Sequence, residues 1–150
     1  MQAQEIMIRN VYKVKESDKV RSVIEKFITH RISGLPVVNE RNEIVGYISD
    51  GDIMRFIGKQ SDRVVDFMYF STIIRDPRCL EDKVAEILNL DVMTLCKKKV
   101  ITADWETDID QIAAILGKKQ IKKLPIVRSG VLVGIISRGD VIRHAFRTII

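Results

Sequence analysis

Two Ser-x-x-Asp pairs, Ser49 with Asp52 and Ser137 with Asp140, combine residue types that could bind a sugar phosphate. A carboxylate can accept two hydrogen bonds from a ribose 2′,3′-diol. A serine hydroxyl beside the free N–H groups of a helix start can bind a phosphate. The same spacing at a strand-to-helix junction is also a capping box, which satisfies the helix start without a ligand. The motif by itself leaves both roles open, and one pair of residues can serve both.

The chain contains two copies of the segment that carries these pairs. Residues 33–38 (SGLPVV) match 122–127 (KKLPIV) at an offset of 89, and 45–53 (VGYISDGDI) match 133–141 (VGIISRGDV) at an offset of 88. The one-residue difference falls in a polar turn, where loop length varies at small cost. Because apolar positions keep their places in both copies, the repeat predicts two units packed about a pseudo-twofold axis.

Each copy has the pattern of a small sheet packed with helices, which predicts an α/β fold. Apolar residues at three- and four-residue spacing predict an amphipathic helix ahead of two paired strands. The expected order is extended segment, helix, strand, strand and helix: 11–14, 18–30, 35–38, 44–49 and 50–58 in the first copy, and 100–102, 108–119, 124–127, 132–137 and 138–148 in the second. Thr107 with Asp110 predicts a capping box for the first helix of the second copy.

The predicted domains are a first repeat over residues 1–58, an inter-repeat segment over 59–90 and a second repeat over 91–150. The inter-repeat segment is expected to be helical, near 62–70 and 81–90. It is longer than a plain linker, and it is apolar enough to pack on the domain or on a partner.

The duplicated order of these motifs resembles the cystathionine-β-synthase (CBS) repeat. The pattern is apolar-Pro-apolar-apolar, a polar turn, and then Val-Gly-x-Ile-Ser-x-Gly-Asp-apolar. Residues 91–94 (DVMT) and 100–103 (VITA) resemble the lead-in and first strand of such a repeat. The resemblance implies one disc-like unit whose two clefts bind AMP, ADP, ATP or S-adenosylmethionine. It also implies a module that commonly dimerises and controls an attached or associated protein.

On this resemblance, fifteen residues are candidates for nucleotide binding. They are Val11, Tyr12, Leu35, Pro36, Ser49 and Asp52 in the first copy, and Ile101, Thr102, Lys122, Lys123, Leu124, Pro125, Ser137, Arg138 and Asp140 in the second. The apolar members would hold adenine, although ordinary core packing explains Val11, Leu35 and Leu124 equally well. We expect the cleft using Lys122, Lys123, Arg138 and Asp140 to prefer phosphorylated nucleotides, because cations favour phosphate. The alternative is that these lysines form a solvated surface.

The absence of several motifs and the composition limit the range of functions that the sequence predicts. The sequence has no HExxH, Walker-type glycine-rich loop, GxSxG or CxxC motif, so we expect neither an enzyme nor a metal site. The net charge of +5 attracts anions, but aromatic residues make up only 6% of the chain. Nucleic-acid binding is therefore the least favoured reading, since it lacks a stacking platform. A signal peptide pattern is absent and no apolar run is long enough to span a bilayer, which predicts a cytoplasmic protein.

The sequence therefore predicts a non-catalytic regulatory module that binds an adenosine-type nucleotide as regulatory ligand and requires no other cofactor. We expect it to form a homodimer and to signal to an effector protein whose identity the sequence does not give. The alternative is a structural dimerisation or interaction module whose clefts hold no ligand.

Overall fold

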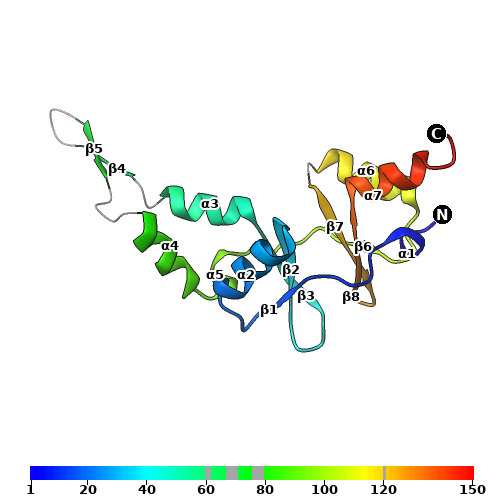
Figure 1. Ribbon diagram of the computed structural model, residues 1–150, viewed down its shortest axis with the longest axis horizontal. Helices are drawn as coiled ribbons and strands as arrows, with labels where there is room; N and C mark the ends of the chain where they lie inside the picture. The colour runs from blue at the N-terminus through cyan, green and yellow to red at the C-terminus, as the bar shows by residue number, and fades with distance from the viewer. Residues whose placement is uncertain (60–61, 67–70, 76–79, 120) are drawn as a thin grey trace.

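The computed structural model describes every residue of the chain except 60–61, 67–70, 76–79 and 120. Two three-stranded sheets, each with a parallel and an antiparallel pairing, run in the orders β1-β2-β3 and β6-β7-β8 (Figure 1). Their strands are β1 (Val14–Lys15), β2 (Gly34–Val38), β3 (Ile44–Ser49), β6 (Ala103–Asp104), β7 (Lys123–Arg128) and β8 (Val131–Ser137). The predicted α/β fold of two pseudo-twofold related repeats is confirmed.

Helices flank each sheet at equivalent places in the two repeats. They are α2 (Val20–His30) and α3 (Asp50–Lys59) in the first repeat, and α6 (Ile109–Lys118) and α7 (Arg138–Phe146) in the second. The predicted first strands, 11–14 and 100–102, begin later than expected, because parallel pairing starts only at Val14 with Val37 and at Ala103 with Ile126. The residues before them instead run between the two repeats.

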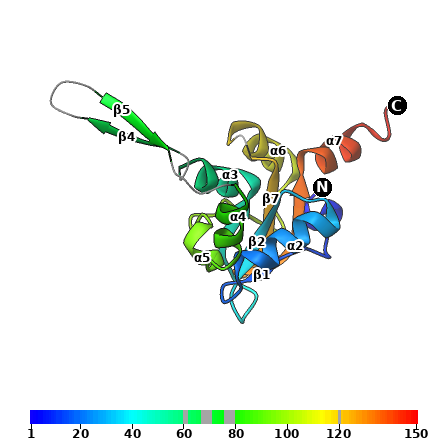
Figure 2. The ribbon, with the colours of Figure 1, turned by 60° about the vertical axis from the view of Figure 1, so that its left-hand side comes forward.

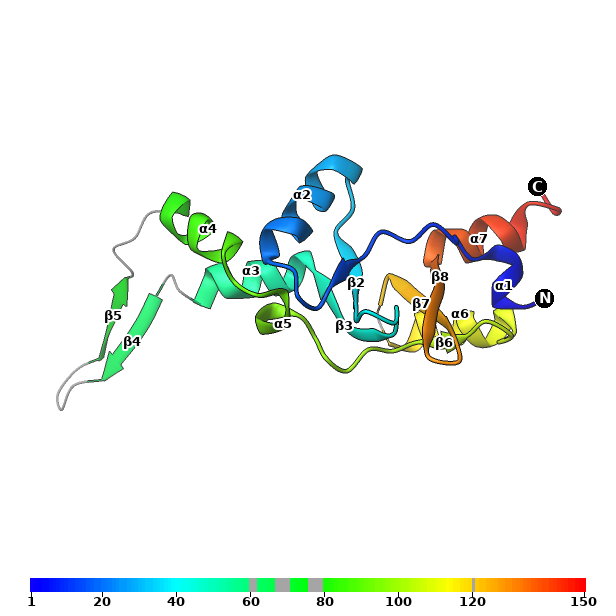
Figure 3. The same cartoon turned by 90° about the horizontal axis from the view of Figure 1, so that it is seen from below.

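The short helices α1 (Ala3–Ile6) and α5 (Val92–Leu95) are exchanged between the repeats. Figure 3 shows the blue α1 beside α7 of the second repeat, and the green α5 beside β3 of the first. The Ala3 N–H donates to the Thr107 carbonyl at 2.8 Å, and the equivalent Val92 N–H donates to the Asp18 carbonyl at 3.0 Å. The lead-in of the first repeat therefore pairs with the second repeat, and the lead-in of the second repeat pairs with the first.

This exchange replaces the capping box predicted at Thr107 and Asp110. Asp108 is the N-cap residue of α6, and its side chain makes no capping hydrogen bond. The Ile109 N–H at the helix start instead donates to the Met1 carbonyl at 3.0 Å. A backbone carbonyl from the exchanged lead-in satisfies the donor, so a side-chain cap is not needed.

Each hydrophobic core takes in residues from an exchanged lead-in. Val92 and Cys96 join the first core, and Ala3 and Met7 join the second. Other buried members are Val14, Val20, Val23, Leu35, Val37, Ile48, Ile53 and Ile87 in the first core, and Ala103, Ile112, Leu116, Leu124, Ile126 and Ile136 in the second. The two repeats are therefore held together by burial of apolar surface as well as by backbone hydrogen bonds.

The inter-repeat segment corrects one sequence expectation. Residues 62–66, predicted as helix, form strand β4 (Asp62–Asp66), which pairs antiparallel with β5 (Ser71–Arg75). Both strands are rich in β-branched residues, which favour extended backbone. Residues 67–70 of that predicted helix lie outside the described part of the chain. The second expected helix is present as α4 (Leu80–Leu88). Figure 2 shows the β4–β5 hairpin projecting away from the two sheets.

Among the described residues, no helix combines the length and the apolar character needed to cross a membrane.

Candidate functional site

Two clefts contain most of the predicted site residues. The first, here called the Asp140 cleft, has a volume of about 230 Å³ and is lined by Ile8, Asn10, Val11, Tyr12, Ile32, Gly34, Lys123, Ile135, Ser137, Asp140 and Arg143. The second, here called the lysine cleft, has a volume of about 450 Å³ and is lined by Ser33, Gly34, Tyr47, Ser49, Asp50, Lys97, Lys99, Val100, Ile101, Lys119, Ile121, Lys122, Lys123 and Pro125. Gly34 and Lys123 line both clefts.

The two clefts correspond position by position through the internal repeat. Val11 and Tyr12 of the Asp140 cleft are equivalent to Val100 and Ile101 of the lysine cleft at the offset of 89. Other equivalent pairs are Ile32 with Ile121, Ile135 with Tyr47, and Ser137 with Ser49. The clefts are therefore two versions of one site, related by the pseudo-twofold axis.

Each cleft combines elements from both repeats. In the Asp140 cleft, Ile8 of the first lead-in exchanges backbone hydrogen bonds of 2.9 and 3.0 Å with Ile135 of β8. In the lysine cleft, Lys97 and Tyr47 of β3 exchange the equivalent pair, both at 2.9 Å. The lead-in of one repeat thus faces the strand-to-helix junction of the other. Both the Asp140 cleft and the lysine cleft therefore need residues from both copies.

Asp140 is held at the start of α7 by a reciprocal capping box. Its Oδ2 accepts a hydrogen bond from the Ser137 N–H at 2.8 Å, and its own N–H donates to Ser137 Oγ at 3.1 Å. Arg143 Nη2 donates to Asp140 Oδ1 at 2.8 Å. Burial raises the pKa of Asp140, but the hydrogen bonds from Ser137 and the Arg143 charge lower it by more, so the pKa lies below its usual value. The carboxylate in this cleft is therefore ionised at neutral pH.

Asp52 has the same sequence context but a different position. Its Oδ2 accepts hydrogen bonds from the Ser49 N–H at 2.9 Å and from Ser49 Oγ at 3.2 Å, and Arg55 Nη2 lies 2.5 Å from its Oδ1. Its side chain is only 6% exposed, against 12% for Asp140. Asp52 does not line the lysine cleft, where the exposed Asp50 is the acidic residue. The predicted role of Asp52 as a ligand contact is not supported by its placement.

Several other predicted site residues lie outside both clefts. Leu35 and Leu124 are core residues, 1% and 0% exposed. Pro36 is buried within β2, and Thr102 is half-buried beside the lysine cleft without lining it. Pro125, in contrast, lines the lysine cleft. The competing reading of Leu35 and Leu124 as ordinary core is the one that the structure favours.

The structure does not bring Lys122, Lys123, Arg138 and Asp140 together in one cleft. Lys122 lines only the lysine cleft, whereas Asp140 lines the other. The Arg138 guanidinium donates to the Ile121 carbonyl at 2.9 Å and to the Leu116 carbonyl at 3.0 Å. Arg138 therefore caps the Leu116 carbonyl in the last turn of α6, which the helix end leaves free, and also binds the Ile121 carbonyl beyond the helix.

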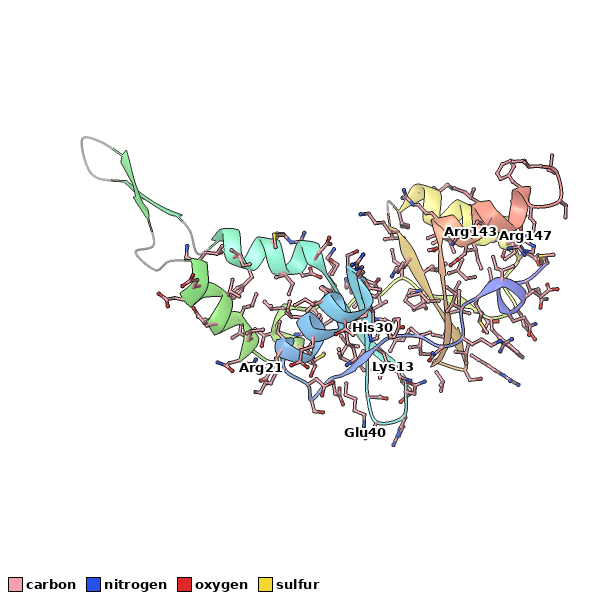
Figure 4. The ribbon with its side chains drawn as sticks, viewed as in Figure 1. Lys13, Arg21, His30, Glu40, Arg143 and Arg147 are labelled. Carbon is pink, nitrogen blue, oxygen red and sulfur yellow. The ribbon has the colours of Figure 1, made fainter. Side chains whose placement is uncertain are left out.

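Sequence reasoning missed Arg143 and most of the lysines. Arg143 and Arg55 follow the two motif aspartates by three residues, so the repeated unit is longer: Ser-x-Gly-Asp-x-x-Arg. Lys97, Lys99 and Lys119 could have been found by carrying the 89-residue offset onto the lead-in and the end of the first helix. Figure 4 shows Arg143 on α7 and Arg147 just beyond its end.

Aromatic residues occupy one wall of each cleft. In the Asp140 cleft, the Tyr12 ring stacks on His30, the last residue of α2, with centroids 3.9 Å apart. In the lysine cleft, burial and then the Asp50 charge raise the pKa of Tyr47 to about 12. The Tyr47 hydroxyl is therefore neutral at physiological pH and remains a hydrogen-bond donor.

The described residues contain no group of three or more His, Cys, Asp and Glu side chains that could hold a metal ion. What the two clefts offer is binding chemistry: apolar walls, hydroxyl and ammonium donors, and one ionised, oriented carboxylate.

Comparisons with known proteins agree with this architecture. The family model for the CBS domain matches residues 3–59 and 91–147. An uncharacterised protein of Methanocaldococcus jannaschii, MJ1426, is 30% identical over 151 residues, which cover 91% of this chain and 89% of that protein. The crystal structure of CBSX2 in complex with AMP superposes with a TM-score of 0.75 at 22% identity, covering 99% and 98% of the two chains. The CBS domain pair of MJ0100, in complex with 5′-methylthioadenosine and S-adenosyl-L-methionine, gives a TM-score of 0.68 at 19% identity, covering 99% and 98%.

Proposed function

The chain belongs to the CBS domain family, with two copies of the domain, and we propose that it is a non-catalytic regulatory module that binds adenosine-type nucleotides in its two clefts. The observation that carries the proposal is the ionised Asp140, held by Ser137 and Arg143 at the wall of a cleft whose surface is mainly apolar. An oriented carboxylate is a suitable acceptor for two ribose hydroxyl groups. CBSX2 and MJ0100, which share this fold, were crystallised with adenosine ligands.

The apolar wall opposite this carboxylate suits the base of the nucleotide. Val11 and Ile135 approach the cleft from the two repeats, and the Tyr12 ring is fixed by its stack on His30. Aromatic and aliphatic surfaces of this kind hold a planar base by contact and stacking. The backbone groups of the same lead-in segment can recognise the edge of the base.

Regulation follows from the way each cleft joins the two repeats. A ligand that contacts the lead-in of one repeat and the helix start of the other favours the arrangement in which both contacts are made. A change in that arrangement is what an effector protein would detect. We infer that the chain transmits ligand binding through the relative position of its repeats, acting on a partner in the cytoplasm.

A homodimer would supply a suitable framework for this signal. Met54 on α3 and Ile142 on α7 occupy equivalent positions in the repeat and are 60% and 58% exposed. Phe146, one turn beyond Ile142 on the same helix, is 49% exposed. Exposed apolar residues at equivalent places on two helices fit a self-complementary interface.

Calorimetric titration of AMP, ADP, ATP and S-adenosylmethionine into the purified chain tests the proposal. We expect saturable binding of at least one of the four ligands. Asp140→Asn should reduce the affinity at the Asp140 cleft by at least about tenfold, because it removes the charge that strengthens the ribose hydrogen bonds.

Asp52→Asn is the matched control, because Asp52 has the same motif and the same kind of partners but lies outside both clefts. It should leave the affinity within about threefold of wild type. Absence of binding for all four ligands would favour the alternative of a ligand-free dimerisation module. The size of the particle measured without nucleotide would then identify that function directly.

A further inference from the structure

The two copies of the repeat differ in charge at four equivalent positions. The first copy has Ile8, Asn10, His30 and Ser33, and the positions 89 residues later have Lys97, Lys99, Lys119 and Lys122. Ile8 and Asn10 line the Asp140 cleft, whereas Ser33 lines the lysine cleft. All four lysines line the lysine cleft, and Lys123 completes the set. Because the repeat relates the positions, the charge difference is confined to side chains around one site and does not reflect a different fold.

The lysine cleft has more positive charge than a single phosphate can neutralise. Its five lysines face one carboxylate, that of Asp50, so four positive charges are uncompensated by the cleft itself. A monophosphate ester has a charge of about −1.5 to −2 at pH 7. The Asp140 cleft, in contrast, contains Lys123 and Arg143 as its cations, and Arg143 is already paired with Asp140.

Neutral donors in the lysine cleft add to this preference. The Ser33 hydroxyl and the protonated Tyr47 hydroxyl lie among the lysines. Phosphate oxygens are strong acceptors that combine well with both charged and neutral donors. The cleft volume, about 450 Å³ against about 230 Å³, also leaves room for a longer chain of phosphates.

We propose that the lysine cleft selects nucleoside polyphosphates, with three phosphates preferred over one, whereas the Asp140 cleft takes an adenosine ligand with little or no phosphate. This proposal rests on the proposed function, since it assumes that the clefts hold nucleotides. It assigns the two clefts of one chain to ligands of different charge, so that the module binds a different adenosine species in each cleft.

The test exchanges lysines for the residues that the repeat places at the equivalent positions. Lys99→Asn combined with Lys122→Ser converts two positions of the lysine cleft to their counterparts, Asn10 and Ser33. The control, Lys98→Asn with Lys118→Ser, removes the same charge from exposed neighbours that do not line the cleft. All four lysines are exposed, so neither double variant removes core packing, and thermal unfolding verifies that both fold.

Calorimetric titration with AMP and ATP measures the expected difference in affinity. Wild type should bind ATP at least about tenfold more tightly than AMP at the lysine cleft, and K99N/K122S should lower ATP affinity by about tenfold while changing AMP affinity by less than about threefold. The K98N/K118S control should retain the wild-type ATP affinity within about threefold. Inorganic triphosphate should compete with ATP in wild type, because the phosphate chain provides the recognised charge.

Three outcomes would overturn the proposal. Equal loss of ATP affinity in both double variants would show that a general positive field is responsible. Equal wild-type affinities for AMP and ATP would show that the lysines do not distinguish one phosphate from three. Tighter, lysine-dependent binding of a single-stranded oligonucleotide would assign the surface to nucleic acid. If AMP binding is present and lost in Asp140→Asn, these outcomes defeat this proposal alone, whereas absence of all nucleotide binding also defeats the proposed function.

Discussion

At the residue scale, Ser137 and Asp140 cap the start of a helix and also line a cleft. Each satisfies a backbone N–H of the other at the start of α7, with distances of 2.8 and 3.1 Å. Ser137→Ala removes the acceptor for the Asp140 N–H and should lower the free energy of unfolding by about 1 kcal/mol. Urea unfolding at constant m-value measures the change. The exposed Ser17→Ala serves as control and should be neutral, and equal effects of both variants would refute the capping role.

The lowered pKa of Asp140 predicts a pH dependence of stability. A carboxyl group whose folded pKa lies below its unfolded pKa stabilises the fold above roughly pH 4, and this stabilisation is lost as the pH falls through the folded pKa. Asp140→Asn should therefore destabilise the protein most at neutral pH and progressively less below about pH 4. Urea titrations at a series of pH values measure the difference. A difference that is constant with pH would mean that the charge of Asp140 does not contribute.

At the element scale, the exchanged lead-ins depend on close approach to a strand. A Cβ built at Gly134 of β8 would lie 2.5 Å from Met7 Sδ and 2.9 Å from Met7 Cβ. The Gly134→Ala variant should therefore lower the free energy of unfolding by about 1–3 kcal/mol through overpacking. Gly117→Ala is the control, because a Cβ there meets nothing within 4 Å and alanine favours a helix.

Combining Gly134→Ala with Met7→Ala separates overpacking from other causes. If Met7 is the obstacle, the double variant should be more stable than the sum of the two single effects predicts. Denaturant unfolding of wild type, the two single variants and the double variant gives the four free energies of unfolding in this double-mutant cycle. Additive effects would show that Gly134 is required for a reason other than contact with the Met7 side chain beyond its Cβ.

The elements that sequence predicted well are those whose burial repeats along the chain. The paired strands β2–β3 and β7–β8 and the helices that follow them were expected within a few residues, because alternating and helical apolar spacing fixes them locally. The exchange of α1 and α5 could not be predicted in the same way. A four-residue helix has too few apolar positions to indicate which of two equivalent cores it enters.

The candidate site was predictable in kind but not in grouping. Ser137, Asp140, Val11 and Tyr12 were all identified, yet their placement in one cleft depends on the exchange of lead-ins. The sequence also could not distinguish the positions of Asp52 and Asp140, because both have the same local motif. Only the packing around each junction decides which carboxylate lines a cleft.

At the scale of the whole molecule, the equivalent exposed residues Met54 and Ile142 predict a homodimer through α3 and α7. Met54→Lys combined with Ile142→Lys should shift a dimer toward monomer, because buried, unpaired lysines oppose an apolar interface. Analytical ultracentrifugation over a range of concentrations measures the shift. Ile28→Lys, on α2 and 74% exposed, is the control and should leave the dimer intact. A monomeric wild type would refute this part of the proposal.

Lys123 lines both clefts, and we expect it to couple them. One ammonium group cannot give its full charge to two phosphates at once, so ATP in the lysine cleft should weaken AMP binding in the Asp140 cleft. A coupling of roughly fivefold is expected, at the lower end of the usual range for linked sites. By linkage, AMP must weaken ATP binding by the same factor. Titrating each nucleotide with and without a saturating concentration of the other measures both factors.

Lys123→Met retains most of the aliphatic stem and removes the charge, so it should abolish the coupling while each cleft still binds its ligand. Unchanged coupling in this variant would mean that the repeats communicate through their relative position alone.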